Sequence, residues 1–171
     1  YSDESIRRRI AAKVRRNNAV VVWCYAPGLI TDRGFDENTM QELTGFTLRH
    51  EMKERPLQLE VSDRQPPLLR HAAGMDSYQV GPVIWCDDPA AQVLGRAGGR
   101  DALAVKPLRD WTSVYTLMPL NKELLAGLCE FAGVHRFART FDVVTANKSY
   151  VMLHASSAGN KPIALPAPAT V

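Results

Sequence analysis

The feature that most constrains this sequence is an unbroken apolar run at residues 20–25, Val-Val-Val-Trp-Cys-Tyr, which stops at Pro27-Gly28. A run of β-branched residues without polar alternation is typical of a strand that is covered on both faces, as in parallel sheets flanked by helices. Ligands of open α/β sheets bind at the carboxyl ends of such strands. The run therefore predicts a central parallel strand, with Pro27-Gly28 at the lip of a ligand crevice.

A basic amphipathic helix is predicted directly before this strand, over residues 4–16. Ile6, Ile10 and Val14 recur every four residues among basic side chains, and Ser2 or Asp3 is placed to cap the first turn. A helix that leads into a parallel strand is the second half of a βαβ crossover, and no strand precedes this one in the sequence. We therefore expect the chain to begin in the middle of a doubly wound unit.

Size and charge narrow the function classes. The 171 residues, 46% of them hydrophobic, suffice for one core and predict a single domain. No window approaches the ~18 uninterrupted apolar residues of a membrane span, so we expect a soluble protein without a membrane partner, cytoplasmic in location. Residues 1–16 hold six basic and two acidic side chains, and the rest holds 15 and 16. Because the body is neutral, a nucleic-acid partner is not expected.

The single domain, residues 1–171, is expected to have three parts. Residues 1–62 form an α/β part, 63–80 an irregular connection, and 81–171 a β-rich part with one helix at about 121–132. In the first part, a short helix starts at Asp36 and ends before Gly45. Period-two alternation at residues 48–52 and 57–61, and short apolar or β-prone segments further along, predict the remaining strands. They are Leu48 to Met52, Leu57 to Val61, Val83 to Cys86, Gln92 to Arg96, Ala102 to Lys106, Trp111 to Leu117, Val134 to Arg139, Phe141 to Thr145, Tyr150 to His154 and Ile163 to Leu165.

Cysteine and histidine spacing predicts no metal site and no cofactor. The three cysteines are widely spaced with no CxxC pair, so we expect small buried hydrophobic residues rather than disulfides or ligands. The four histidines occur singly, with no HExxH and no His-x-His, which favours structural or surface roles. They are His50, His71, His135 and His154.

Several segments together resemble one known family. They are residues 21–28 (VVWCYAPG), 42–46 (ELTGF), 87–89 (DDP), 93–96 (VLGR), 113–115 (SVY), 132–135 (AGVH), 151–155 (VMLHA) and 163–166 (IALP). Their order is similar to that in the glutamine-amidotransferase-like domain of bacterial β-galactosidase-type glycoside hydrolases. The likeness covers about four fifths of the chain and is weak between Arg49 and Tyr78.

The resemblance implies a flavodoxin-like (class I amidotransferase-like) α/β fold with a partial parallel sheet and a β-rich C-terminal extension. It also implies an accessory module that mediates oligomer formation, a trimer in this family, beside a catalytic glycosidase barrel. The expected partners are thus other copies of the chain and the parent barrel. The family's first βα units and its barrel have no counterpart in this sequence, so neither do the barrel's catalytic glutamates.

Catalytic candidates are few. Cys24 with His135 is the first, because amidotransferases use a cysteine on a nucleophile elbow activated by histidine. An elbow needs small neighbours, whereas Trp23 and Tyr25 flank Cys24, which we expect to point into the packed sheet. Asp87 and Asp88 are the only two adjacent aspartates, and a glycosidase needs two carboxylates across its sugar.

Three functions remain open at this stage. A non-catalytic accessory and oligomerisation domain is preferred. A hydrolase of glycosides or amides is one alternative, with Cys24, His135, Asp87 or Asp88 in its site. A carbohydrate-binding module is the other, for which Trp111 is the tryptophan that the sequence leaves free to be exposed and to stack on a sugar.

Overall fold

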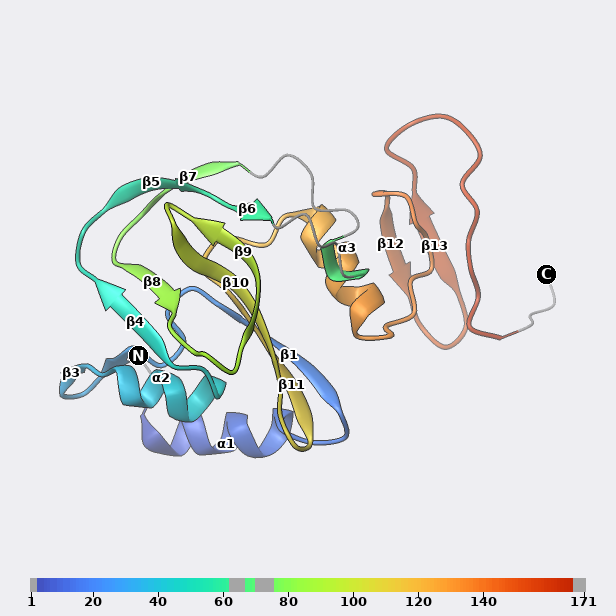
Figure 1. The fold of residues 1–171 in the computed structure, drawn as a ribbon. Helices are drawn as coiled ribbons and strands as arrows, with labels where there is room; N and C mark the ends of the chain where they lie inside the picture. The colour runs from blue at the N-terminus through green and yellow to red at the C-terminus, as the bar shows by residue number, and fades with distance from the viewer. Residues whose placement is uncertain (1–2, 62–66, 70–75, 168–171) are drawn as a thin grey trace.

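The computed structural model describes residues 3–61, 67–69 and 76–167 (Figure 1). Its elements, in chain order, are α1 (Glu4–Val14), β1 (Ala19–Cys24), β2 (Ile30–Thr31), β3 (Gly34–Phe35), α2 (Glu37–Thr44), β4 (Leu48–Glu51), β5 (Arg55–Gln58), β6 (Glu60–Val61), the 3-10 helix η1 (Pro67–Leu69), β7 (Ser77–Val80), β8 (Val83–Cys86), β9 (Gln92–Ala97), β10 (Arg100–Pro107), β11 (Trp111–Thr116), α3 (Lys122–Phe131), β12 (Val143–Ala146) and β13 (Val151–His154). Of the described helices, none is long and apolar enough to cross a membrane.

The α-helices begin where their capping residues predict. Asp3, Asp36 and Asn121 precede α1, α2 and α3, and each side-chain oxygen accepts a backbone N–H of the first turn at 2.8 Å. This contact satisfies one of the N–H groups that a helix start leaves without a partner. Helix α2 ends at Gly45, whose φ of 78° lies in the left-handed region that glycine adopts without a steric penalty.

The main sheet has five strands in the order β1-β11-β10-β9-β6 (Figure 1). Strands β1 and β11 run parallel, with Val22 opposite Val114. Every other neighbouring pair in this sheet is antiparallel. The meander predicted from Gln92 to Leu117 is confirmed as β9, β10 and β11, and its Gly98-Gly99 turn has positive φ at both residues.

The expected flavodoxin-like α/β fold is wrong. The structure is rich in β-strands, and its larger sheet is mixed, with one parallel pair and several small antiparallel sheets beside it. Strand β1, expected at the centre, lies at an edge, and within the described residues β11 is its one paired neighbour. Its valines are only partly buried, and Trp23 is its buried residue. An unbroken apolar run therefore marked a strand with one uncovered edge, not a strand enclosed by two neighbours.

Four two-stranded antiparallel sheets surround or follow the main sheet: β2-β3, β4-β8, β5-β7 and β12-β13. The core lies between the main sheet, α2 and the β4-β8 pair. Its largest fully buried side chains include Tyr115 of β11 and Phe46, whose ring centroids are 6.2 Å apart. Ile84 of β8 is also fully buried. These contacts hold α2 and β8 against β11.

The part after β11 follows the predictions only in places. Helix α3 is confirmed, and β12 and β13 form a hairpin on the far side of α3 from the main sheet (Figure 1). Residues 134–139 and 163–165, expected as strands, are not strands. They meet through the Ala164 N–H, which donates to the Phe137 carbonyl at 2.7 Å. A single backbone hydrogen bond does not make a ladder, so these two segments do not pair as strands.

Most of the expected irregular connection, residues 63–80, lies outside the described residues. Its described pieces differ from the expectation, because η1 is helical and residues 77–80 form β7. Helix η1 packs closely on α3 at Gly127. A Cβ added there would lie 2.0 Å from the Leu68 carbonyl oxygen. Glycine is therefore required in the middle of α3 for this close approach.

Candidate functional site

Cys24 is the last residue of β1, and its side chain is exposed rather than buried in the packed sheet as expected. Desolvation raises the pKa of its thiol above the ordinary value. A protonated thiol is a poor nucleophile. Cys86 is buried and Cys129 half-buried, and all three described cysteines are free thiols.

His135 contacts neither Cys24 nor the aspartates among the described residues. Its Nε2 lies 2.9 Å from the Ala164 carbonyl oxygen, and its ring packs edge-to-face on Phe137 with centroids 4.8 Å apart. A ring nitrogen that faces a carbonyl must carry its proton and donate. His135 thus joins residues 135–137 to residue 164, and the structure does not bring it together with Cys24.

Asp87 and Asp88 point to different partners. Asp88 Oδ2 accepts from Lys106 Nζ at 2.7 Å and from the Thr47 N–H at 3.1 Å, and only 5% of its side chain is exposed. Burial raises the pKa of Asp88, but the hydrogen bonds from Lys106, Thr47 and Ala90 outweigh it, and the net shift is downward. Asp87 is 59% exposed and lies 3.3 Å from Arg49 Nε. The pair therefore does not flank a common space as the carboxylates of a glycosidase would.

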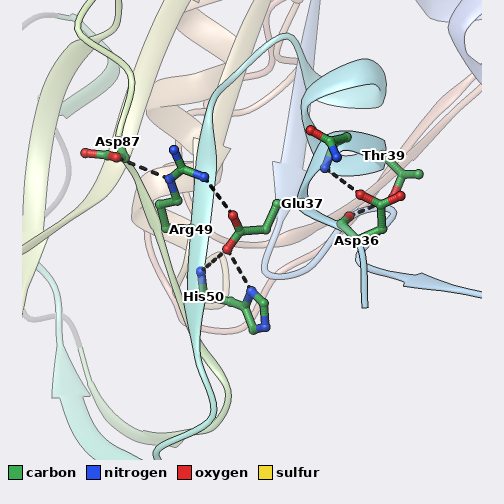
Figure 2. A network of polar contacts seen from close by, with 7 residues as sticks. Asp36, Glu37, Thr39, Arg49, His50 and Asp87 are labelled. Carbon is green, nitrogen blue, oxygen red and sulfur yellow. Dashed lines mark hydrogen bonds and ion pairs between the residues drawn. The ribbon is translucent and has the colours of Figure 1, made fainter. Parts of the chain in front are cut away.

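A polar cluster that the sequence did not single out lies at the start of α2 (Figure 2). Glu37 accepts from Arg49 Nη1 at 2.8 Å, and its Oε1 lies 2.8 Å from His50 Nδ1 and 3.0 Å from the His50 backbone N–H. Partial burial raises the pKa of Glu37, but the hydrogen bonds from Arg49 and His50 prevail and lower it. The acidic first turn of α2 was the signal available in the sequence.

This Glu37 cluster contains the carboxylate and histidine of a catalytic dyad without a nucleophile. No described serine, threonine or cysteine hydrogen-bonds His50. Arg49 also bonds Asp87, which follows β8, so the cluster connects α2, β4 and the end of β8. Among the described residues, no group of three or more His, Cys, Asp or Glu side chains could hold a metal ion, and His71 lies outside them. The arrangement therefore stabilises the fold around α2.

Trp111, the tryptophan that the sequence left free to be exposed, is buried, with only 7% of its surface accessible. Its ring packs edge-to-face on Trp23 with centroids 6.4 Å apart, and the Arg15 guanidinium lies 5.4 Å from its centre. Trp85 lies beneath the Arg100 guanidinium at 3.9 Å. Sugar binding at Trp111 stays a prediction, but the aromatic rings that solvent reaches are elsewhere.

The outer edge of β1 has no paired strand among the described residues. The Tyr25 N–H donates to the Thr116 carbonyl at 2.8 Å. Alternate residues of a strand direct their backbone groups to the same neighbour, so Trp23 and Val21 also face β11. The backbone groups of Val20 and Val22 consequently face the edge where no described strand pairs.

Helix α1 leaves apolar side chains exposed to solvent. It contains no buried residue among those described. Ile6 and Ile10, one turn apart, are 41% and 36% exposed, whereas Val14 packs on the core. Arg15 fixes the end of the helix by donating to the Leu43 carbonyl of α2 at 2.7 Å. The two isoleucines of the predicted amphipathic helix thus lie on a flank that is open to solvent.

Comparison with solved structures finds a likeness of fold. The fold is similar to part of a bacterial β-galactosidase. The solved structure is that of the β-galactosidase from Bacillus circulans sp. alkalophilus, with a TM-score of 0.53 and 16% sequence identity. The match covers 82% of this chain and 22% of that chain, so this chain spans about a fifth of its structural neighbour's length. No family model and no curated sequence matches.

This likeness supports only the broadest of the expectations drawn from the sequence. It relates the fold to a domain of a glycoside hydrolase, in line with the resemblance drawn from the sequence segments. At this identity the comparison establishes similarity of fold. A function for this chain has to account for two surface features, which are the unpaired edge of β1 and the exposed isoleucines of α1.

Proposed function

We propose that this chain is a non-catalytic accessory and oligomerisation domain of a β-galactosidase-like glycoside hydrolase. The structural neighbour supports the enzyme class. The observation that carries the assembly role is the uncovered edge of β1 together with the exposed isoleucines of α1. The dispersed candidates Cys24, His135, Asp87 and Asp88 support an absence of catalysis in this segment.

An open edge of this kind favours association. A strand edge presents unpaired N–H and C=O groups, and proteins commonly block such edges with charges, proline or short strands. Strand β1 has six residues, Ala-Val-Val-Val-Trp-Cys, with no charge and no proline. Pairing it with a strand of another subunit satisfies the backbone groups of Val20 and Val22.

Helix α1 offers further exposed apolar surface to a partner. Burial of each isoleucine, Ile6 and Ile10, against a neighbouring subunit would remove apolar area from water. Each would contribute about 1–2 kcal/mol to the free energy of association. Basic side chains including Arg9 and Lys13 surround these isoleucines, which favours an acidic rim on the opposing surface. The proposed assembly is a homo-oligomer, with a trimer as the state that the family resemblance implies.

Sedimentation equilibrium on the chain and on an Ile6→Glu/Ile10→Glu double variant tests the proposal. We expect the unmodified chain to self-associate and the double variant to sediment as a monomer, because two carboxylates would then be buried without partners. Leu125→Glu is the matched control: Leu125 is also an exposed apolar residue on a helix, and this variant should associate normally. A monomeric unmodified chain, or equal association of all three proteins, would overturn the oligomerisation role.

A further inference from the structure

A cleft of about 430 Å³ lies at the carboxyl end of the parallel pair β1-β11. Its walls come from Cys24 at the end of β1 and Tyr25 directly after it, from Tyr78 and Gln79 of β7, and from Leu117 and Met118 after β11. This volume lies within the ~300–1,000 Å³ typical of small-molecule sites. The carboxyl end of parallel strands is also where open sheets bind ligands. The position first suggested by the strand and turn at residues 20–28 therefore has a cavity.

The chemistry of this β1-β11 cleft selects an uncharged ligand. None of the described residues that line it carries a charged side chain. The Cys24 thiol stays protonated because desolvation raises its pKa. Tyr25 and Tyr78 are 36% and 37% exposed, so aromatic surface is available to a ligand. Rings and protonated sulfur of this kind take the apolar face of a neutral molecule.

Tyr25 is held in place by contacts at both of its ends. Its φ of 64° is uncommon for a bulky residue, and such outliers are found where surrounding structure determines the backbone. The Tyr25 hydroxyl donates to the Pro82 carbonyl at 3.0 Å, and the Tyr25 carbonyl accepts from the Tyr115 hydroxyl at 3.0 Å. Burial raises the pKa of Tyr115 well above its ordinary value, so that hydroxyl stays a donor. The Tyr25 ring is thus fixed beside the cleft.

We propose that the β1-β11 cleft binds an uncharged pyranose, whose apolar face packs on Tyr25 and Tyr78. The Tyr25 hydroxyl oxygen retains lone pairs, and the exposed Gln79 amide can both donate and accept, so sugar hydroxyls find partners at the rim. The choice of a sugar over other neutral ligands rests on the proposed relation to a glycoside hydrolase. Trp111 is not among the described residues that line the site.

Amide chemical-shift titration of the 15N-labelled chain with methyl β-galactopyranoside and methyl β-glucopyranoside tests this inference. We expect saturable shifts at residues 24–25, 78–81 and 117–118. The Tyr78→Ala variant should weaken binding about tenfold, in keeping with the loss of one aromatic contact. Tyr25→Asn should do the same, because asparagine tolerates the left-handed backbone while removing the ring. Tyr150→Ala, which removes an exposed tyrosine of the hairpin, should bind as the unmodified chain does.

Three results would overturn the inference. They are an absence of saturable shifts with both glycosides, shifts that Tyr78→Ala and Tyr25→Asn leave unchanged, and binding of cyclohexanol or phenol at the cleft without binding of either sugar. The last result identifies an apolar site. Sedimentation of the same samples separates this outcome from the assembly proposal, because loss of sugar binding with intact association leaves the oligomerisation role standing.

Discussion

At the residue scale, the two adjacent aspartates after β8 differ in how much they stabilise the fold. Asp88 is nearly buried and holds Lys106, which also donates to the Gly45 carbonyl at 2.8 Å. Asp87 is exposed and meets Arg49 at the longer distance of 3.3 Å. Removing one partner of a buried ion pair leaves an uncompensated charge, whereas exposed pairs contribute little.

We expect Asp88→Asn to lower the free energy of unfolding by about 3 kcal/mol, because Lys106 then remains without its carboxylate. Asp87→Asn should change it by about 1 kcal/mol or less. Urea denaturation of the two variants measures the difference. Equal effects would show that the two carboxylates have equivalent surroundings, contrary to the structure.

The same carboxylate makes stability depend on pH. The folded-state pKa of Asp88 is lowered from 3.8, so the unfolded chain binds more protons in the interval below that value. The stabilisation by Asp88 is fully present above about pH 4 and is lost as pH falls through the folded-state pKa. Glu37, also lowered, acts in the same direction from its ordinary 4.5. Thermal melts between pH 2 and 5 should show a shallower acid slope for Asp88→Asn than for Asp87→Asn.

At the element scale, Gly127 is a position where helix propensity alone would give the wrong sign for the effect of a substitution on stability. Alanine is the better helix former by about 1 kcal/mol, so Gly127→Ala should stabilise an isolated α3. In the protein, the added Cβ would lie 2.0 Å from the Leu68 carbonyl oxygen of η1. We expect a net loss of about 1–3 kcal/mol, the usual range for overpacking. Denaturation of Gly127→Ala beside Leu125→Ala, an exposed position of the same helix, measures it, and a stabilised Gly127→Ala would contradict the packing of η1 on α3.

Local signals predicted the helices well because their causes are local. Asp3, Asp36 and Asn121 act on the next turn of the chain, and Gly45 needs only its own backbone freedom. The antiparallel meander β9-β10-β11 was also predictable, since short turns join neighbouring strands. Residues 134–139 show the limit, because whether a strand forms depends on a partner strand that the local sequence does not specify.

At the scale of the whole molecule, the error in fold class has one source. The apolar run of β1 was interpreted as evidence that helices cover both faces of the strand and that a neighbouring strand pairs with each of its edges. Strand β1 instead joins β11 across a long stretch of chain, and β11 continues an antiparallel meander. The strand and turn at residues 20–28 predicted a crevice, but the sequence could not show which residues line it. The β1-β11 cleft combines residues near 24, 78 and 117, which only the tertiary fold brings together.

The direction of backbone groups along β1 yields a sharp test of the assembly role. Val22 directs its N–H to the uncovered edge, and Val21 directs its own to β11. Proline removes one donor and is tolerated at strand edges but not where a ladder bond is needed. Val22→Pro should therefore keep the fold while abolishing self-association, and Val21→Pro should lose about 1–3 kcal/mol of stability, because it removes a β1-β11 ladder hydrogen bond and leaves the acceptor without a partner. Circular dichroism and sedimentation of both variants check this, and a Val22→Pro chain that is folded and still associates would show that subunits meet somewhere other than β1.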